Sequence, residues 1–356
     1  RPAAVAKAAM EATEVGAHAQ NDALYFASYA HLAIHEDMLR DRRRTLAYLQ
    51  AVEAQRARIG GAVVLDVGAG VGVLSVFCAR AGARKVYAVE ASGVALHAVA
   101  VVRANRLADV VEVRQCRVED LSLPEKVDVI ISEWMGHFLV YENMFSSVIH
   151  ARDKFLKEDG IMLPSHACMF LSACTQMETY LNRVAFWTHQ YGIDFSPLIP
   201  HAVKSWFEQA QTETVPPQNL ITFATPMHFI NCYTASAGTY AEICSKFDLK
   251  AHGKARLTGF ASWFDVFFGA GRDVNSLAEL KASGALTLST SPDCGDTHWR
   301  HTVFYLDVPI DVEQDDTISG SIVASRQRDN PRFFNATVAG SVDPAAVKFS
   351  KTFRVE

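Results

Sequence analysis

The chain has 356 residues, enough for about two domains, and 49% of them are apolar while 21% are charged. This balance is typical of a compact protein with a sizeable buried core and excludes a largely disordered chain. The formal net charge of −5 argues against a general nucleic-acid-binding protein, because neutralising phosphates requires a basic surface. No uninterrupted apolar run reaches about 18 residues, so we expect no membrane-spanning helix.

The cysteines indicate a reducing compartment. They number seven, at positions 78, 116, 168, 174, 232, 244 and 294, and none forms a CxxC pair. An odd, scattered set is typical of free thiols, so we expect a protein of the cytoplasm, the nucleus or both. Because the first residue is Arg1 rather than Met, we expect a trimmed chain whose start carries little information about targeting.

The first 163 residues divide into two segments. Residues 1–60 are predicted to be helical, since they are rich in Ala, Leu and charges and place Met38, Leu39, Leu46 and Leu49 at helix-like spacing. Strands and helices then alternate. The predicted strands are Val63–Val67, Val86–Val89, Val110–Arg114 and Val127–Ile131, with helices over 74–79 and about 93–105. Such alternation predicts βαβ units and a parallel sheet covered on both faces.

The pattern changes after Pro164. The predicted strands are Ile221–Phe223, Glu242–Phe247, Arg256–Phe268, Ala285–Ser289, His301–Val308, Ser319–Val323 and Phe334–Val338. Short strands separated by Gly, Asp, Asn or Pro predict an antiparallel barrel or sandwich. Aromatic residues within about 178–207 have helix-like spacing and no strand signal, so we expect a helical insertion there. The predicted fold is an α/β domain followed by a β domain.

A glycine-rich loop joins the first predicted strand to a helix. It contains Asp66, Gly68, Gly70 and Gly72, and glycines there allow a tight turn and close approach to a ligand. Position 73 is Val, so the GxGxxG pattern of NAD enzymes is not met. Glu90 ends the next predicted strand, where a carboxylate can accept both hydroxyls of a ribose. A nucleoside with an amino-acid tail and no phosphate, S-adenosylmethionine, fits this pattern best.

Two glutamates follow another predicted strand. Glu133 and Glu142 lie within the segment Ser132–Met144, among aromatic and apolar residues, directly after Ile131. Two desolvated carboxylates are costly unless a cation satisfies them, which favours a cation-binding site at this edge of the sheet. The alternatives are two acids on a solvated loop, or a structural pair bound to the protein's own arginines.

Four motifs, in order, resemble those of the protein arginine methyltransferases, and the resemblance covers most of the chain. They are Tyr25-Phe26-x-x-Tyr29 with His35-Glu36-Asp37-Met38-Leu39 and Asp41-x-x-Arg44-Thr45, the cofactor loop Val64–Gly72, the double-E loop Ser132–Glu142, and the THW loop Thr297-His298-Trp299. The resemblance implies N-terminal helices over the cofactor site (1–60) and a Rossmann-like S-adenosylmethionine-dependent domain (61–163). It also implies an antiparallel β-barrel substrate domain (164–356), whose helical arm at about 178–207 makes a head-to-tail homodimer.

The resemblance also implies residue roles at the cofactor. Arg44 would pair with the cofactor carboxylate, Glu90 with the ribose, and Glu119 with the adenine amino group. The lid residues Tyr25, Phe26 and Tyr29 would fold over the bound cofactor. The complete implied cofactor-binding set is Tyr25, Phe26, Tyr29, His35, Met38, Arg44, Asp66, Gly68, Gly70, Gly72, Glu90, Val118 and Glu119.

The substrate would be an arginine in a protein, such as a histone tail or an arginine/glycine-rich segment. Glu133 and Glu142 would clamp its guanidinium, with His298, paired with Asp41, beside them; these four form the implied catalytic set. The implied substrate-binding set is Tyr29, Met38, Glu133, Met135, Glu142, Met144, His298 and Trp299. The THW loop together with Met38 resembles the type I branch, which makes monomethylarginine and then asymmetric dimethylarginine.

Three other interpretations fit the sequence less well. His31 and His35 have the spacing of a zinc pair, but position 32 is Leu and no third ligand is evident, so we expect no metal site. A small-molecule methyltransferase would share the glycine loop and Glu90 but would not need the double-E and THW loops. A catalytically silent dimeric scaffold that binds basic tails is the other alternative, and the intact glutamate pair argues against it.

Overall fold

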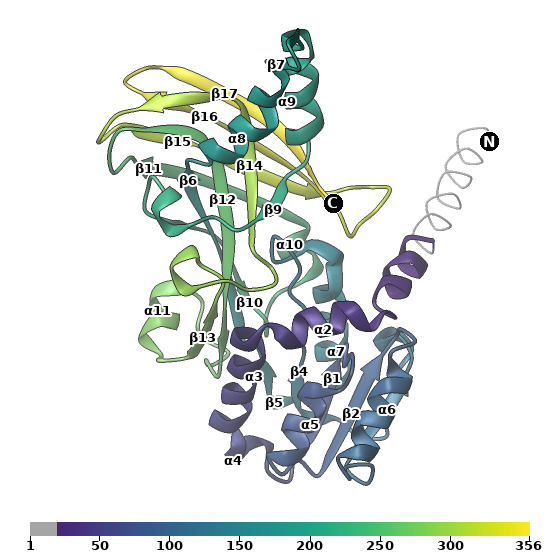
Figure 1. The fold of residues 1–356 in the computed structure, drawn as a ribbon. Helices are drawn as coiled ribbons and strands as arrows, with labels where there is room; N and C mark the ends of the chain where they lie inside the picture. Colours follow the sequence, from purple (N-terminus) through teal and green to yellow (C-terminus); the bar gives the residue numbers. More distant parts are fainter. Residues whose placement is uncertain (1–19) are drawn as a thin grey trace, which may run out of the picture.

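The computed structural model describes residues 20–356 and contains a parallel sheet followed by antiparallel sheets (Figure 1). The predicted order of an α/β part and then a β part is therefore confirmed. The parallel sheet lies at one end of the molecule and the antiparallel sheets at the other, with the N-terminal helices beside their junction. Residues 1–19, which sequence analysis predicts to be helical, lie outside the described residues.

Short helices open the described chain. A helix over residues 20–28, called the lid helix below, precedes α2 (Leu32–Arg40), α3 (Arg42–Ala54) and α4 (Arg56–Ile59). Asp41 separates α2 from α3 and caps α3, because its side chain accepts a hydrogen bond of 2.9 Å from the Arg44 backbone N–H. In α3, the fully buried Tyr48 donates its hydroxyl proton to the Ser132 carbonyl oxygen at 2.9 Å. Helix α3 is thus fixed to the start of the double-E loop.

The parallel sheet has the strand order β3-β2-β1-β4-β5. Its strands are β1 (Val63–Val67), β2 (Lys85–Glu90), β3 (Val111–Gln115), β4 (Val127–Ile131) and β5 (Leu156–Leu163). Three helices cover it: α5 (Val73–Arg80) packs on β1 and β2, α6 (Ala95–Ala104) on β3, and α7 (Met144–Phe155) on β1, β4 and β5. Strand order reverses between β1 and β4, and open α/β sheets bind ligands at the carboxyl ends of such strands.

The antiparallel part contains a six-stranded sheet, β10-β6-β12-β14-β9 with β13 on β12, and a four-stranded sheet, β11-β15-β16-β17. Its strands are β6 (His166–Cys174), β9 (Gln211–Glu213), β10 (Thr225–Asn231), β11 (Glu242–Lys250), β12 (Ala255–Phe268), β13 (Leu286–Ser289), β14 (His301–Val312), β15 (Thr317–Arg326), β16 (Phe334–Asp343) and β17 (Val347–Val355), with helices α10 (Ala237–Ala241) and α11 (Leu277–Ala282). Aromatic side chains join the sheets. Phe247 contacts Phe260, and Phe304 contacts Phe353, each pair with ring centroids 5.2 Å apart. These contacts close the sheets around one barrel-like core.

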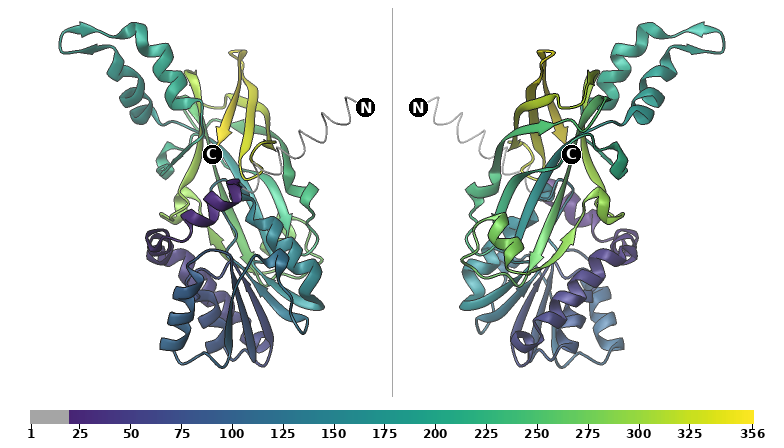
Figure 2. Two further views of the ribbon diagram at one scale, coloured as in Figure 1. Left: turned by 90° about the vertical axis from the view of Figure 1, so that its right-hand side faces the viewer. Right: turned by 90° about the vertical axis from the view of Figure 1, so that its left-hand side faces the viewer.

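An arm projects from the barrel between β6 and β9 (Figure 2). It consists of α8 (Met177–Val184) and α9 (Ile199–Phe207), joined at the tip by the hairpin of β7 (His189–Gln190) and β8 (Ile193–Asp194). The predicted helices are present, but the expectation of no strand is wrong at the tip. Tyr191 and Gly192 have positive φ angles of 55° and 77°, and two such residues form a tight hairpin turn.

Strand prediction in the barrel was incomplete. The predicted strand Ile221–Phe223 is wrong, because Thr222 makes only an isolated bridge to Ala251 and β10 begins at Thr225. Sequence analysis also does not predict β6, β9, β10 or β17 of the barrel, nor β5 of the parallel sheet. Every position of β6 is buried, so the strand lacks the alternation of polar and apolar residues that identifies a half-exposed strand. The alternation in β17 is present and could have predicted it.

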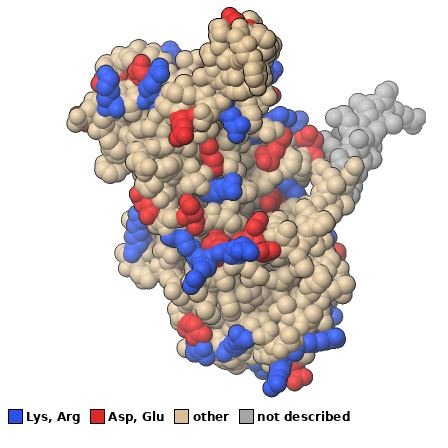
Figure 3. Space-filling model, in the orientation of Figure 1, with Lys and Arg blue, Asp and Glu red and all other residues tan. Residues whose placement is uncertain are grey.

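The surface mixes charges of both signs. In Figure 3, acidic and basic side chains lie next to one another across the middle of the visible face, around α2. The pair of Glu36 and Arg40, 2.6 Å apart, belongs to α2 and contributes to this mixing. Within residues 20–356, no helix combines the length and apolar character that crossing a bilayer requires.

Candidate functional site

A cavity of about 300 Å³ lies at the carboxyl edge of the parallel sheet. The lid helix and α2 border it on one side, and barrel loops that carry His298 and Arg332 border it on another. The glycine loop and the double-E loop complete its walls. The cavity therefore lies where sequence analysis predicted the ligand, between the two main parts of the fold.

Most of the predicted site residues meet in this cavity. Those that line it are Tyr25, Phe26, Tyr29, His35, Met38, Arg44, Gly68, Gly70, Glu90, Val118, Glu119, Glu133, Met135, Glu142, Met144, His298 and Trp299. The lining also contains polar residues that sequence analysis did not assign to the site, among them Ser147 and Arg332. Ser147 lies one helical turn beyond the double-E loop, which is a usable signal, whereas no motif marks the barrel loop that contains Arg332.

Asp41, Asp66 and Gly72 are not part of the lining. Asp66 is fully buried within β1, and its Oδ2 accepts a 2.6 Å hydrogen bond from Ser75 Oγ. Burial raises the pKa of Asp66 to about 7. This geometry corrects the expectation of direct cofactor contact: Asp66 supports the start of α5 from behind the cavity wall. Gly72, with φ of 87°, is the N-cap of that helix.

Glu90 anchors the glycine loop. Its Oε2 accepts the Gly70 backbone N–H at 2.9 Å, and its Oε1 accepts the Ser92 backbone N–H at 2.8 Å. Each carboxylate oxygen can accept more than one hydrogen bond, so the group retains capacity for a diol. Gly70 has φ of 55°, and a Cβ atom there would lie 3.2 Å from the His35 ring. A side chain at position 70 would therefore crowd the His35 ring, and glycine lets the backbone of the loop lie this close to it.

The rest of the lining fits the other groups of S-adenosylmethionine. Arg44 provides a buried guanidinium that can pair with the amino-acid carboxylate. At the other end, Val118 provides an apolar wall beside Glu119, whose Oε1 accepts a 2.6 Å hydrogen bond from Ser147 Oγ. Burial alone would raise the pKa of the Glu119 carboxyl. The hydrogen bond from Ser147 and the charge of Arg117 together have the larger effect, so the pKa lies below its usual value. Glu119 is therefore a charged acceptor beside an apolar wall.

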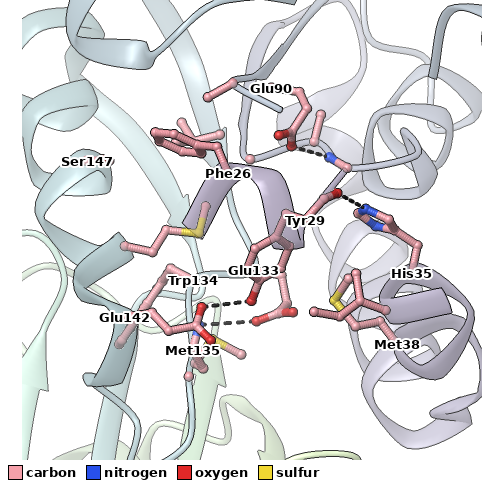
Figure 4. A pocket seen from close by; sticks show the side chains of 18 of the residues that line it. Phe26, Tyr29, His35, Met38, Glu90, Glu133, Trp134, Met135, Glu142 and Ser147 are labelled. Carbon is pink, nitrogen blue, oxygen red and sulfur yellow. Dashed lines mark hydrogen bonds between the residues drawn. The ribbon is translucent and has the colours of Figure 1, made fainter. Parts of the chain in front are cut away.

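The two glutamates of the double-E loop face the same part of the cavity (Figure 4). Glu133 Oε2 accepts a 2.9 Å hydrogen bond from Arg44 Nε, so the protein's own arginine holds this carboxylate in the structure. Glu142 Oε2 instead accepts a 2.7 Å hydrogen bond from the Tyr29 hydroxyl. Residues of the lid region and of α3 thus supply donors to the glutamate pair.

Burial dominates the electrostatics of Glu142. It raises the pKa of the carboxyl above its usual value, and the charge of Glu133 acts in the same direction, while hydrogen bonds from Tyr29 and Tyr25 act against it. Two carboxylates in a desolvated cavity disfavour each other's ionisation, and an incoming cation relieves this cost. The pair therefore has the electrostatics expected of a guanidinium site.

The THW loop of the barrel docks onto the double-E loop. Trp299 Nε1 donates to the Met135 carbonyl oxygen at 2.8 Å, and His298 Nδ1 lies 2.8 Å from Asp41 Oδ2. Burial alone would raise the pKa of the Asp41 carboxyl. The hydrogen bonds from His298 and from the Arg44 backbone together have the larger effect, so the pKa lies below its usual value. Asp41 therefore fixes His298 at the cavity without lining it.

Two methionines flank the glutamate pair. Met144 packs so tightly on the glycine loop that a Cβ atom at Gly68 would lie 2.2 Å from its terminal methyl group. Met38 lies on α2, and its carbonyl oxygen accepts a 3.3 Å hydrogen bond from Arg44 Nη1. Both side chains are unbranched and can adapt to a ligand.

The histidines considered as a zinc pair have other surroundings. His35 Nε2 lies 2.9 Å from the Tyr29 carbonyl oxygen, where it joins α2 to the end of the lid helix. In the part of the chain that the structure describes, no three His, Cys, Asp or Glu side chains are arranged to hold a metal ion.

Comparisons with known protein families agree with this geometry. Residues 165–342 match the model of the arginine methyltransferase oligomerization subdomain. Residues 43–165 match the model of the ribosomal protein L11 methyltransferase, PrmA. The two matches meet where the parallel sheet ends and the antiparallel sheets begin.

Related sequences and structures cover nearly the whole chain. It is 41% identical over 337 residues to a probable protein arginine N-methyltransferase 6 from Arabidopsis thaliana, covering 88% of this chain and 78% of that protein. A probable protein arginine N-methyltransferase 6.1 from Oryza sativa subsp. indica is 44% identical over 331 residues, covering 89% of this chain and 87% of its own length.

Among solved structures, the Trypanosoma brucei PRMT1 enzyme-prozyme heterotetrameric complex with AdoHcy has a TM-score of 0.83 and 33% identity, covering 92% of this chain and 100% of its own. Arabidopsis thaliana protein arginine methyltransferase 10 has a TM-score of 0.80 and 37% identity, covering 93% and 100%. Fold, site geometry and sequence similarity agree, and the chain belongs to the protein arginine methyltransferase family.

Proposed function

We propose that this S-adenosylmethionine-dependent arginine methyltransferase is a type I enzyme, which forms monomethylarginine and then asymmetric dimethylarginine. The observation that carries the proposal is the pair of methionines, Met38 and Met144, that line the cavity with the two glutamates. Unbranched side chains can make room for a second methyl group on the nitrogen that already carries one. A rigid ring in place of Met38 would redistribute that space.

The glutamates supply the alignment that this chemistry needs. A guanidinium has a pKa above about 12, so at neutral pH it is protonated, delocalised and a poor nucleophile. Glu133 and Glu142 bind its N–H groups, each charge-assisted hydrogen bond contributing about 1.5–3 kcal/mol. They hold the positive charge toward the nitrogens that they contact and leave one terminal nitrogen relatively electron-rich. S-adenosylmethionine, when bound, supplies the electrophilic methyl group.

Alignment of the terminal nitrogen accounts for a large part of the rate, since near-attack positioning contributes several kcal/mol in general. The nitrogen loses a proton during or after methyl transfer. Candidate proton acceptors among the lining residues include the carboxylates of Glu133 and Glu142 and the imidazole of His298. Asp41 holds that imidazole through Nδ1.

We propose arginine-bearing protein segments as substrates, such as histone tails or arginine/glycine-rich regions. Two features support this class: the formal net charge of −5 and the carboxylate pair in the cavity, both of which favour a cationic partner. We also propose that the protein works in the cytoplasm, the nucleus or both. All seven cysteines are free in the structure, which suits a reducing compartment.

We further propose a homodimer assembled through the arm. Large apolar side chains are exposed on the arm: Leu181, Phe186, Tyr191, Ile193, Leu198 and Trp206. Tyr191 at the tip is 98% exposed, and a surface of this kind is typical of an interface. The root of the arm is firmly fixed, because Phe207 stacks on Tyr305 of β14 with ring centroids 4.5 Å apart. A rigid arm with an apolar tip suits a two-fold assembly.

The product tests the type I assignment. We expect a histone-tail peptide incubated with S-adenosylmethionine to gain monomethylarginine and then asymmetric dimethylarginine. Fragmentation spectra identify the asymmetric product by neutral loss of dimethylamine, whereas the symmetric product loses monomethylamine. Met38→Phe should shift the product ratio, because the ring redistributes the space beside the guanidinium. Symmetric product, or monomethyl product alone after exhaustive incubation, would refute the assignment. The absence of any peptide methylation would count against this peptide as a substrate.

The glutamate clamp predicts a loss of turnover with little change in cofactor affinity. Glu142→Gln should lower turnover by at least ~100-fold, because losing a charge-assisted partner removes about 3 kcal/mol of positioning. Glu125→Gln is the matched control, since Glu125 forms a surface ion pair with Arg84 away from the cavity. Near-normal turnover of Glu142→Gln would show that the carboxylate does not hold the substrate.

Glu90 should determine cofactor affinity. Glu90→Ala is expected to weaken S-adenosylmethionine binding by ~10- to 100-fold, because the two hydroxyls lose their acceptors. Calorimetry measures the affinity directly. Glu112→Ala, which removes an exposed ion-pair partner of Lys85 on the neighbouring strand, should bind the cofactor normally. Unchanged affinity in Glu90→Ala would mean that the cofactor ribose lies elsewhere.

The arm should control the oligomeric state. Replacing Tyr191 and Ile193 by Ser together should convert a dimer into a monomer at micromolar concentration, with weaker cofactor binding, because the tip loses its apolar contact surface. Sedimentation velocity distinguishes the two states. Phe223→Ser, at a similarly exposed aromatic residue outside the arm, should leave the dimer intact. If the parent protein itself sediments as a monomer, the proposed dimer is wrong.

A further inference from the structure

Arg332 lies in the barrel loop between β15 and β16, yet it contacts two parts of the active site. Its side chain is only 14% exposed. On one side, Nη2 and Nε donate to Asp22 Oδ1 of the lid helix at 2.6 and 3.1 Å. On the other side, Nη1 donates to the carbonyl oxygen of Glu142 at 2.5 Å. One guanidinium therefore bridges the lid helix and the double-E loop.

The backbone of Glu142 needs outside support. Its φ of 71° lies in the left-handed region, which costs an ordinary residue roughly 1–2 kcal/mol. The Glu142 N–H donates to the Arg332 carbonyl oxygen at 2.9 Å, and the Glu142 carbonyl accepts from the Arg332 guanidinium. Both polar groups of this residue's backbone are thus held by a single partner, and such support maintains a strained conformation.

The lid helix is held by the same guanidinium. The planar group of Arg332 lies 3.8 Å from the ring centroid of Tyr25, which lines the cavity. The carboxylate of Asp22 is shared, because its Oδ2 accepts a 2.8 Å hydrogen bond from Nη1 of Arg117, two residues beyond β3. Asp22 therefore ties the lid helix to the barrel and to the parallel-sheet domain at once. In the structure, all these contacts are made with the lid helix beside the cavity.

We propose that Arg332 is a positioning residue that couples the closed position of the lid helix to the orientation of Glu142. When the lid helix covers the cavity, Asp22 and Tyr25 fix the guanidinium of Arg332, and that guanidinium fixes the Glu142 peptide. When the lid helix moves away, Arg332 loses these partners and Glu142 loses a rigid support. The clamp for the substrate guanidinium is thereby completed only over an occupied cofactor site. The proposal rests on arginine methylation itself and is independent of the type I assignment.

The side chain of Glu142 responds to the same switch. Tyr29, at the end of the lid helix, donates its hydroxyl proton to Glu142 Oε2. The lid helix thus contacts the carboxylate directly, and it contacts the backbone through Arg332. Two routes from one helix to one glutamate make the clamp sensitive to where that helix lies. If Arg332 is replaced, the hydrogen bond from the Tyr29 hydroxyl to the Glu142 carboxylate can still form. A variant of Arg332 therefore tests the route through the backbone of Glu142 alone.

The test separates cofactor affinity from turnover at saturating cofactor. Calorimetry gives the affinity, and total methyl groups transferred to a histone-tail peptide give kcat, whichever dimethyl product forms. Arg332→Gln should weaken cofactor binding by about threefold or more and lower kcat by about tenfold or more. Arg332→Lys keeps the ion pair with Asp22 but cannot reach both partners at once. It should therefore retain most of the cofactor affinity and still have a lower kcat. If Arg332 only held the lid helix in place, kcat at saturating cofactor would not fall.

Asp22→Asn tests the coupling from the other side. It should lower both quantities in the parent protein, but it should lower kcat by a smaller factor in the Arg332→Gln background, because the route through Arg332 is already broken and only the route through Tyr29 remains. Asn21→Ala is the matched control, since Asn21 also bonds the barrel loop, through the Asp329 carbonyl oxygen, without contacting Glu142. It should leave both quantities within about twofold.

Two outcomes would overturn the proposal. If the Arg332 variants weaken cofactor binding but keep full kcat at saturation, Arg332 only holds the lid helix. If Asp22→Asn has the same effect on kcat in both backgrounds, the two contacts are independent. Should Arg332→Gln fail to fold, as judged by thermal unfolding, the comparison of Arg332→Lys with Asp22→Asn still decides, because the first should change mainly kcat and the second should change both quantities. A peptide that no variant and no parent protein methylates would instead count against the choice of substrate.

Discussion

Two carboxylates that share one desolvated cavity are the constraint on which this structure depends. Glu133 and Glu142 raise the cost of each other's charge, so the fold surrounds them with donors taken from distant parts of the chain. Arg44 comes from α3 and Tyr29 from the end of the lid helix. The remaining electrostatic demand favours a cationic ligand, such as the substrate guanidinium proposed above.

The site belongs to no single domain. The parallel sheet supplies the glycine loop, Glu90 and the double-E loop, whereas the barrel supplies Trp299 and Arg332. The hydrogen bond from Trp299 Nε1 to the Met135 carbonyl oxygen joins the two parts beside the glutamate pair. A displacement of the barrel relative to the sheet would therefore change the cavity directly. The two family models match adjacent segments of the chain, and residues from both segments line the cavity.

Sequence analysis predicted the parallel sheet well and the barrel less well, for a physical reason. Buried parallel strands such as Val63–Val67 are continuous apolar runs between turn residues, which is a strong signal. Strand β6 is buried at every position but contains Ser, Cys and His, so neither alternation nor a pure apolar run marks it. The site residues were found because their motifs are local in sequence. Arg332 was not found, because its role depends on contacts with Asp22 and Glu142 that lie 310 and 190 positions away.

The shape of the double-E loop has a consequence for the order in which the protein assembles. Phe138, Leu139, Glu142 and Asn143 all have positive φ angles, and residues other than glycine do not adopt such a series without external contacts. Several of those contacts come from residues near the end of the chain, including the aromatic rings of Phe304 and Phe334 against Phe138. A nascent chain that has emerged only as far as β5 still lacks these barrel residues. Glu133 and Glu142 can therefore take up the positions seen here only once the barrel has folded against the loop.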